Sequence, residues 1–394
     1  MTREVVFVGA ARTAIGSFGG SLKDVPPADL GALVIKTALE RAGVAPKDVG
    51  HVVVGHVIPS VPQDAYISRV AALNAGVPQE APAFNVNRLC GSGLQAIVSA
   101  AQAIQLGDCE VAVGAGAESM SRGAYLVTSN RWGARMGDVK MLDFMLGALH
   151  DPRMHIHMGI TAENVAARYE ITREQQDAYA VQSQQRAAKA IAAGYFKEQI
   201  VPVEIKTRKG VVLFDTDEGV KADTNVEALA KMKPAFKKED GTVTAGNAST
   251  LNDGAGAVVM ASSDKAKELG LKPLARLVSY GHAGVEPEYM GIGPVPASRN
   301  ALAKAGLTVA DMDVIEANEA FAAQACAVAK ELGLDNEKVN PNGSGISLGH
   351  PVGGTGAILV TKAIYELQRT GGRYALITMC IGGGQGIAMV IERV

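Results

Sequence analysis

Two cysteines, a histidine and an asparagine stand in short turns where reactive side chains are commonly held. Cys90 lies in the segment Asn87-Arg-Leu-Cys-Gly-Ser-Gly, between a predicted strand and a helix that begins just past the thiol, as the apolar spacing of residues 94–101 indicates. A thiol at a helix N-terminus feels the positive end of the helix dipole, which favours the thiolate. Taken alone, Cys90 suits two roles, a buried structural cysteine or a nucleophile that forms covalent intermediates.

His350 lies in the turn Gly349-His-Pro, with Pro351 predicted as the first helical residue and His350 at the helix cap. A histidine on such a turn suits a general base as well as a structural role. Asn318 directly follows a predicted buried strand. Its amide is suited to holding a water, to polarising a carbonyl or to satisfying loop backbone.

Cys380 ends another predicted strand and is followed by the glycine turn Ile-Gly-Gly-Gly-Gln-Gly. One cysteine and one histidine suffice for simple acyl transfer, because the histidine activates the thiol. A further cysteine indicates a further proton transfer, as is needed when a weak carbon acid is deprotonated. The set therefore predicts acyl transfer coupled to deprotonation at carbon.

Two glycine motifs resemble those of other enzymes but lack their context. Residues 91–96 match the G-x-G-x-x-A turn of dinucleotide-binding folds, but a second strand that ends in an acidic residue does not follow at the required distance. Residues 345–349 match the G-x-S-x-G turn of hydrolases, but no Asp follows Ser347 in the sequence and the only later histidine is His350. We therefore expect neither nicotinamide binding nor a serine hydrolase.

The elements that carry the reactive residues occur twice in the chain. Residues 38–49 resemble residues 301–312, an offset of 263, and residues 106–113 parallel residues 370–377, an offset of 264. The turn at Cys90 resembles the turn at His350, an offset of 260. Near-equal offsets in one order predict two copies of one α/β unit. Two-fold packing of these copies would bring both turns to one site at the ends of parallel strands.

A long insertion interrupts the first copy. We predict an N-terminal half formed by residues 1–120 and 249–270, an inserted loop domain at residues 121–248, and a C-terminal half at residues 271–394. The insertion contains basic stretches around Lys206 and Lys231. Its charge and irregular pattern predict a surface subdomain lying over the duplicated core.

Composition narrows the class of protein further. The 394 residues are 47% hydrophobic and 20% charged, which suits a folded α/β protein of two or three domains. The 38 basic and 40 acidic side chains nearly cancel, so neither nucleic acid nor an anionic membrane is expected as a partner. The four cysteines lack C-x-x-C spacing, so neither a metal site nor a disulfide framework is predicted.

The N-terminal segment predicts a strand and not a secretion signal, because no long apolar stretch follows its Arg3. The sequence also contains no continuous apolar run long enough to span a membrane. We therefore expect a cytoplasmic protein.

Together, the four motifs resemble those of the thiolase family, and specifically the bacterial β-ketothiolases or acetyl-CoA acetyltransferases. The motifs are Asn87-Arg-Leu-Cys-Gly-Ser-Gly, Asn318-Glu-Ala-Phe, Gly349-His-Pro and Cys380-Ile-Gly-Gly-Gly-Gln-Gly, in the family's order. Residues 243–249 and His157-Met-Gly are also similar, and the resemblance covers essentially the whole chain. It implies a thiolase fold: two duplicated α/β halves form a five-layered αβαβα core, with an inserted loop domain over the active site.

The resemblance also implies a role for each reactive residue. Cys90 would be the acylated nucleophile, His350 the base that activates it, and Cys380 the group that removes or returns the α-proton of the second acetyl-CoA. The backbone N–H groups of Cys90 and Gly382 would form one oxyanion hole. His350, with a water held by Asn318, would form the other.

Coenzyme A would be a substrate and product, with no tightly bound cofactor expected. The contacts that the resemblance implies are His157, Met158, Lys221, Ala245, Ser249, Met290, Ala320 and Phe321. Lys221 departs from the arginine that relatives often carry there. Its positive charge, with that of Lys206, Arg208, Lys209 and Lys231, predicts that the coenzyme's phosphates lie on the insertion.

The resemblance therefore implies reversible Claisen condensation of two acyl-CoAs and thiolysis of 3-ketoacyl-CoAs, by a homotetramer built as a dimer of dimers. One alternative is a decarboxylating ketosynthase of the same fold, which would pair its cysteine with His–His or His–Asn, so that Cys380 argues against it. Another is a non-catalytic acyl-CoA-binding protein, which would have no use for the two cysteines and His350.

Overall fold

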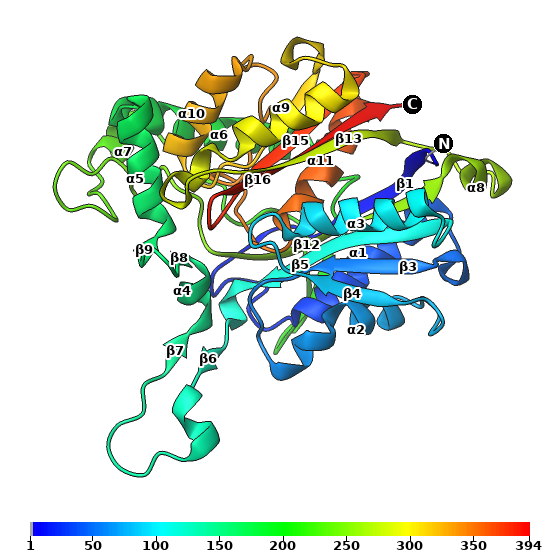
Figure 1. The fold of residues 1–394 in the computed structure, drawn as a ribbon, viewed down its shortest axis with the longest axis horizontal. Coiled ribbons are helices and arrows are strands. Elements are labelled where there is room, and N and C mark those ends of the chain that lie inside the picture. Colours follow the sequence, from blue (N-terminus) through cyan, green and yellow to red (C-terminus); the bar gives the residue numbers. More distant parts are fainter. Residues whose placement is uncertain (1–2) are drawn as a thin grey trace.

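The computed structural model describes residues 3–394, so Met1 and Thr2 of the predicted N-terminal strand lie outside it. The strands form two half-sheets within one layered α/β structure (Figure 1). The first, in spatial order, contains β4 (Ala83–Val86), β3 (His51–Gly55), β5 (Val111–Ser119), β12 (Asn252–Ser262) and β1 (Val5–Arg12). The second contains β13 (Ala275–Gly284), β16 (Gln385–Arg393), β15 (Tyr374–Ile381) and β14 (Val314–Ala317). The half-sheets join where Val6 and Phe7 of β1 pair with β13.

The duplication predicted from the sequence is present in the fold. Helices α1 (Pro27–Ala42) and α9 (Pro294–Ala305) end at Gly43 and Gly306, which have φ values of 67° and 66°. Glycine adopts this left-handed conformation without steric cost, so both copies stop their helix in the same way. Each helix is followed by a one-turn helix and then a strand, β3 in the first half and β14 in the second.

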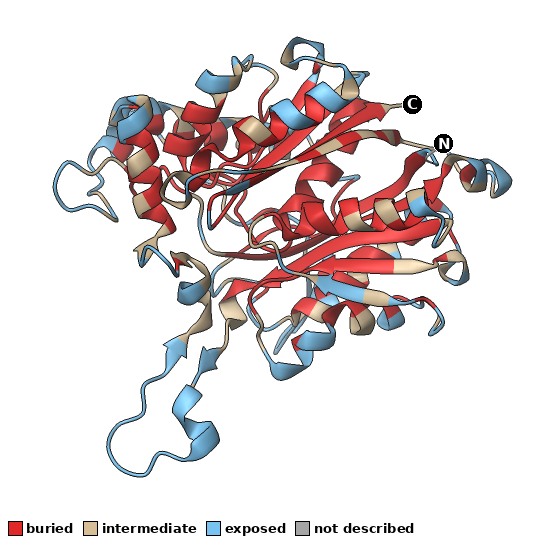
Figure 2. Ribbon diagram, in the orientation of Figure 1, coloured by how far each residue is buried: buried red, intermediate tan, exposed pale blue. Residues whose placement is uncertain are grey.

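Helices and half-sheets alternate in five layers, as expected for the thiolase fold. Helices α1 and α2 (Ile67–Asn74) cover the outer face of the first half-sheet in one apolar cluster. Helices α3 (Ser92–Leu106) and α11 (Thr355–Thr370) fill the central layer between the half-sheets in a second cluster, and α11 is almost entirely buried (Figure 2). Helix α9 covers the outer face of the second half-sheet. The alternating apolar faces of the strands are thereby buried on both sides.

Glycines allow α3 and α11 to cross closely at the centre of the molecule. A Cβ atom on Gly356 would lie 2.1 Å from the backbone nitrogen of Leu94, and one on Gly93 would lie 2.8 Å from that of Ala357. Both distances are shorter than real Cβ contacts. The first turns of the two helices, one from each half, therefore meet at backbone distance.

The prediction that Pro351 begins a helix is wrong. Helix α11 begins at Thr355, and residues 351–354 form a turn in which the N–H groups of Gly354 and Thr355 both donate to the Pro351 carbonyl, each at 2.9 Å. The N–H of Gly353 instead donates to the buried Glu118 carboxylate at 2.8 Å. Glu118, a residue of the other half, thus holds the turn that precedes the helix.

Residues 121–248 lie between β5 and β12 and are more regular than their sequence pattern predicts. Their helices are α4 (Phe144–Ala148), α5 (Met158–Tyr169), α6 (Arg173–Ala192) and α7 (Val226–Ala230). Their strands are β6 (Tyr125–Leu126), β7 (Leu142–Asp143), β8 (His150–Asp151), β9 (Ile156–His157), β10 (Val203–Thr207) and β11 (Gly210–Phe214). Helices α5 and α6 pack against α10 (Ala322–Leu332) of the second half.

One part of this segment, residues 125–143, extends away from the body as an arm formed around the β6–β7 pair (Figure 1). Almost all of the arm is exposed (Figure 2). Within residues 3–394, no helix combines the length and the apolar character needed to cross a membrane.

Candidate active site

Cys90 lies in a tight turn between β4 and α3. Leu89 before it has a φ of 46°, a conformation that costs a non-glycine residue energy and recurs at functional sites. The hydroxyl of Ser92 holds the turn, since it accepts from the Arg88 N–H at 2.8 Å and donates to the Leu89 carbonyl at 2.7 Å. At Gly91, a Cβ atom would lie 2.5 Å from the Ile381 side chain, so glycine is needed for the approach of β15.

The environment of Cys90 favours the thiol and not the thiolate expected from the helix dipole. Burial raises the pKa of Cys90, the N–H groups of Gly382 and of Cys90 itself lower it by hydrogen bonding to the sulfur, and Glu118 raises it. Desolvation outweighs the dipole because the thiolate is a charge removed from water. Cys90 therefore needs a base to become a nucleophile. The same N–H groups could donate hydrogen bonds to the oxyanion of an acyl group that is attached to this sulfur.

Cys380 lies near the end of β15 and is fully buried beside Cys90. Burial raises the pKa of Cys380, and a negative charge on Cys90 raises it further. The thiol packs in an apolar cluster with Met158, Met290 and Phe321. Thus Cys380 is held as a neutral thiol next to the nucleophile, against three of the residues expected to contact coenzyme A.

His350 is buried and is held at both ring nitrogens. Its Nδ1 lies 2.6 Å from the Thr355 hydroxyl, and its Nε2 lies 3.4 Å from the amide nitrogen of Asn318. Burial lowers the pKa of His350 to about 4. The ring is therefore neutral at neutral pH and able to accept a proton.

Residues of the first half hold the turn that carries His350. The His350 N–H donates to Asn252 of β12 at 2.8 Å, while Glu118 of β5 accepts from Val57 at 3.1 Å as well as from Gly353. Burial lowers the pKa of His56, but the neighbouring Glu118 carboxylate raises it, and the result is a pKa of about 9. A protonated His56 therefore faces Glu118 at 3.0 Å. None of the local sequence patterns points to Asn252, Glu118 or Thr355.

A cavity of about 650 Å³ opens next to these groups, between the core and the segment 121–248. Of the residues predicted from the sequence, it is lined by Cys90, His157, Met158, Lys221, Ala245, Ser249, Met290, Ala320, Phe321 and His350. Asn318, Cys380 and Gly382 contact this lining directly. The structure therefore brings these residues together around one cavity.

An aromatic wall of this cavity was also missed. The Phe236 ring stacks on the His157 ring with centroids 4.7 Å apart, and it meets the edge of the Phe321 ring at 6.2 Å. His157 caps helix α5, because its Nδ1 accepts from the Gly159 N–H at 2.9 Å. The signal for Phe236 was present in the sequence, since it interrupts the basic run that begins at Lys231.

Lys221 reaches the cavity mouth on a loop that the first half anchors. Two residues of this loop, Asp217 and Glu218, contact the first half. The buried Arg12 guanidinium donates to both carboxylate oxygens of Asp217, at 2.8 and 2.9 Å. Glu218 accepts from the Ser17 N–H at 2.7 Å. A bidentate pair of this kind fixes position as well as charge.

The other basic residues expected near coenzyme A lie elsewhere. Among the described residues, Lys206, Arg208, Lys209 and Lys231 do not line the cavity. The β10–β11 hairpin packs through Val203 into the cluster beneath α1, which carries its lysines away from the site. Of the predicted basic set, Lys221 alone lines the cavity.

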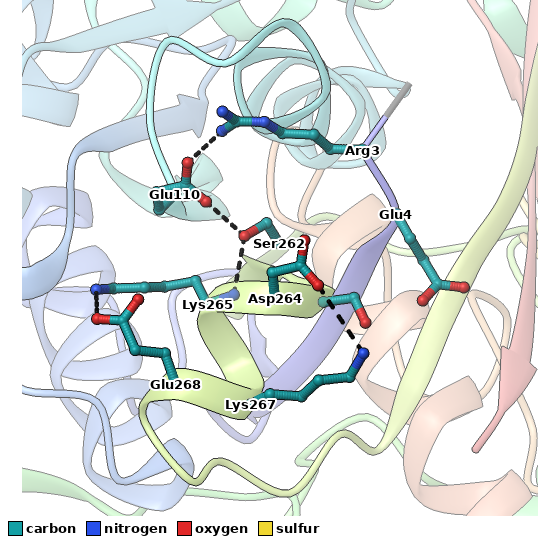
Figure 3. Close-up of a pocket in the computed structure, with 9 residues that line it drawn as sticks. Arg3, Glu4, Glu110, Ser262, Asp264, Lys265, Lys267 and Glu268 are labelled. Carbon is teal, nitrogen blue, oxygen red and sulfur yellow. Dashed lines mark hydrogen bonds and ion pairs between the residues drawn. The ribbon is translucent and has the colours of Figure 1, made fainter. Parts of the chain in front are cut away.

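A second hollow, of about 530 Å³, lies at the other end of the first half-sheet, where β5 begins and β12 ends (Figure 3). Its side chains are exposed charges that pair with one another. Arg3 and Ser262 both donate to Glu110, and Lys265 donates to Glu268 (Figure 3). We therefore locate the chemistry in the cavity at Cys90.

Comparisons with known proteins agree with this geometry. The family model described as thiolase, N-terminal domain, matches residues 5–264, and that described as thiolase, C-terminal domain, matches residues 271–393. The chain is 67% identical over 394 residues to beta-ketothiolase BktB of Cupriavidus necator, covering 100% of both chains. It is 53% identical to an acetyl-CoA acetyltransferase of Chromobacterium violaceum, over 99% of this chain and 100% of that protein.

Solved structures show the same similarity. Human mitochondrial 3-ketoacyl-CoA thiolase superposes with a TM-score of 0.97 at 47% identity, covering 100% of this chain and 99% of that chain. The same human enzyme in complex with CoA superposes with a TM-score of 0.96 at 46% identity, covering 100% and 98%. By its duplicated fold, its sequence matches and its structural neighbours, the chain belongs to the thiolase family.

Proposed function

We propose that the protein catalyses the reversible Claisen condensation of two acyl-CoAs, such as acetyl-CoA to acetoacetyl-CoA, and the CoA-dependent thiolysis of 3-ketoacyl-CoAs. The observation that carries this proposal is the convergence of Cys90, His350 and Cys380 on one cavity. Coenzyme A is then a substrate and product, bound beneath the segment 121–248.

In the first half-reaction, His350 takes the thiol proton of Cys90 while the sulfur attacks the thioester carbonyl of acetyl-CoA. The N–H groups of Cys90 and Gly382 stabilise the resulting oxyanion. The C–S bond to coenzyme A then breaks, and His350 returns the proton to the departing thiolate. The product is acetyl-Cys90 and free coenzyme A.

In the second half-reaction, the Cys380 thiol first gives its proton to the free Nε2 of His350, and the resulting thiolate removes the α-proton of a second acetyl-CoA. The negative charge passes to the thioester oxygen, which accepts hydrogen bonds from the now protonated Nε2 of His350 and from a water held by Asn318. The carbanion carbon attacks acetyl-Cys90, the C–S bond to Cys90 breaks, and His350 gives its Nε2 proton to the Cys90 thiolate, while Cys380 keeps the α-proton and is a thiol again. Thiolysis is the reverse sequence.

A turnover assay in both directions tests this function. With acetoacetyl-CoA and coenzyme A the protein should form acetyl-CoA, and with acetyl-CoA alone it should release coenzyme A and form acetoacetyl-CoA. A protein that binds these thioesters without releasing coenzyme A would contradict the proposal.

Lys221 is proposed to bind the phosphates of coenzyme A through its positive charge at the cavity mouth. Lys221→Glu should therefore raise KM for CoA thioesters far more than it lowers kcat, because the lost attraction acts equally on ground and transition states. Steady-state kinetics measures this, with Lys206→Glu on the distant hairpin as the matched charge reversal. An unchanged KM in Lys221→Glu would remove Lys221 from the binding site.

We further propose a homotetramer in which the arm, residues 125–143, pairs two dimers. The arm exposes large apolar side chains, with Trp132 88% and Met136 97% accessible. Apolar surface of this kind on a projecting segment is covered when copies associate. Light scattering at micromolar concentration should give the tetramer mass, and Trp132→Ser with Met136→Ser should shift it toward dimer. A stable wild-type monomer would contradict the proposal.

A reducing compartment such as the cytoplasm suits this mechanism. Cys90 and Cys380 act as thiols, and the described structure contains them as free cysteines. Cytosolic thiols are kept reduced. We therefore propose a cytoplasmic location.

A further inference from the structure

We infer that Thr355 is a positioning residue that fixes the ring proton of His350 on Nδ1, so that the free electron pair of Nε2 serves as the base for Cys90. This inference rests on the proposed function, because it assigns to His350 the task of accepting the Cys90 proton. Nothing in the sequence pattern distinguishes Thr355 from other helical threonines.

The contacts around Thr355 are few and buried. Thr355 is the first residue of α11 and is 3% exposed. Its Oγ1 atom lies 2.8 Å from the carbonyl oxygen of Pro351 and 2.6 Å from Nδ1 of His350. The hydroxyl therefore has one carbonyl and one ring nitrogen as partners.

Counting protons assigns the direction of each hydrogen bond. The Pro351 carbonyl oxygen also accepts from the N–H groups of Gly354 and Thr355. Two oxygens 2.8 Å apart nevertheless repel unless a proton lies between them, and a carbonyl carries none, so the single hydroxyl proton of Thr355 points to Pro351. The hydroxyl oxygen is then left to accept, which requires the proton of the neutral imidazole to be on Nδ1. The Nε2 atom consequently carries a free electron pair.

The surroundings of Nε2 agree with this assignment. The nearest polar partner of Nε2 is the Asn318 amide nitrogen, a donor, at 3.4 Å. The His350 ring lines the same cavity as Cys90, whose thiol needs a base. In the opposite tautomer, the lone pair of an unprotonated Nδ1 would lie against a lone pair of the Thr355 oxygen. The Nε2 atom would then face Cys90 with a proton already attached.

Helix α11 offers a matched control for this role. Thr361 is also buried, and its hydroxyl donates to the carbonyl four residues earlier, that of Ala357, at 2.9 Å. This is the bond that Thr355 makes to Pro351, without a histidine on the other side. A comparison of the two threonines therefore separates helix stability from tautomer control.

The first test measures the rate at which acetyl-CoA acetylates Cys90 in the full-length enzyme, by rapid quench and mass spectrometry. Thr355→Val keeps the shape but removes the acceptor, so we expect the acetylation rate and kcat to fall at least about tenfold with KM for acetyl-CoA little changed. Thr355→Ser should restore the rate to within about threefold, and Thr361→Val should retain it. Acetylation by Thr355→Val at the wild-type rate, or an equal loss in Thr361→Val, would overturn the inference.

The second test needs no variant at Thr355. In the wild-type enzyme labelled with ¹⁵N-histidine, the His350 resonances, assigned through their loss in His350→Gln, should show a protonated Nδ1 and an unprotonated Nε2. A protonated Nε2 in the neutral ring would overturn the inference even if Cys90 is acetylated. A wild-type Cys90 that acetyl-CoA never labels would overturn the proposed function and the inference with it.

Discussion

Cys380→Ala is expected to accumulate acetyl-Cys90 while condensation falls by about 10²–10⁴, the usual effect of losing a general acid–base group. Acylation uses Cys90, His350 and the N–H of Gly382, none of which the substitution changes. Deprotonation of the second acetyl-CoA is assigned to the thiolate of the buried Cys380, formed by proton transfer to His350. Thiolysis should fall as well, because the departing carbanion must be reprotonated by the same group.

Intact-protein mass spectrometry and turnover in both directions measure this separation. Cys109→Ala is the matched control, because Cys109 is also a free cysteine but lies just before β5, at the end of that strand remote from Cys90. It should acetylate and turn over as the wild type does. Wild-type condensation by Cys380→Ala would refute the role of Cys380 and with it the distinction between a thiolase and a simple acyltransferase.

His350→Ala is expected to slow the formation of acetyl-Cys90 itself by about 10²–10⁴. Burial raises the pKa of Cys90, so the thiol requires a base, and burial lowers the pKa of His350 to about 4, so the ring is available as that base. The wild-type rate should therefore fall only as the pH drops toward 4 and the ring becomes protonated. Both the variant and the pH profile are measured by rapid-quench acetylation.

His282→Gln serves as the control for this prediction. Burial lowers the pKa of His282 to about 4 as well, but its Nε2 lies 2.9 Å from Gln95, outside the cavity. Its substitution should leave acetylation within about twofold of wild type, as expected for a residue outside the reaction. Rapid acetylation of His350→Ala would show that another group activates Cys90.

The reactive residues could be predicted because each one has a local signal. Cys90, His350 and Cys380 stand in glycine turns next to predicted elements, and the near-constant offset between the copies relates the turns before α3 and α11. Cysteine and histidine in such turns indicate candidate reactive residues even when the fold is not known. The repeat then predicts that the turns meet, and the crossing of α3 and α11 confirms that they do.

The residues that hold His350 could not be predicted, because their role depends on contacts across the chain. Asn252 and Glu118 reach the His350 turn from the first half, 98 and 235 residues away in sequence from their partners. An acid at the end of a strand and an asparagine at the start of another occur in many folds.

For a related reason, charge alone did not indicate which basic residues line the cavity. The composition of the β10–β11 hairpin shows its lysines but not the direction in which the hairpin faces. Burial of Val203 beneath α1 decides that direction. At Lys221 the deciding contact is the buried pair of Arg12 and Asp217, which lie 205 residues apart.

The central claim is that acetyl-CoA transfers its acetyl group to Cys90. Intact-protein mass spectrometry of the wild type and Cys90→Ala after mixing with acetyl-CoA tests it most directly, with released coenzyme A measured in the same samples. We expect one acetyl group per wild-type chain, on the peptide that contains Cys90, together with an initial burst of coenzyme A, and we expect neither in Cys90→Ala. An unlabelled wild-type chain, or equal labelling of Cys90→Ala, would contradict it.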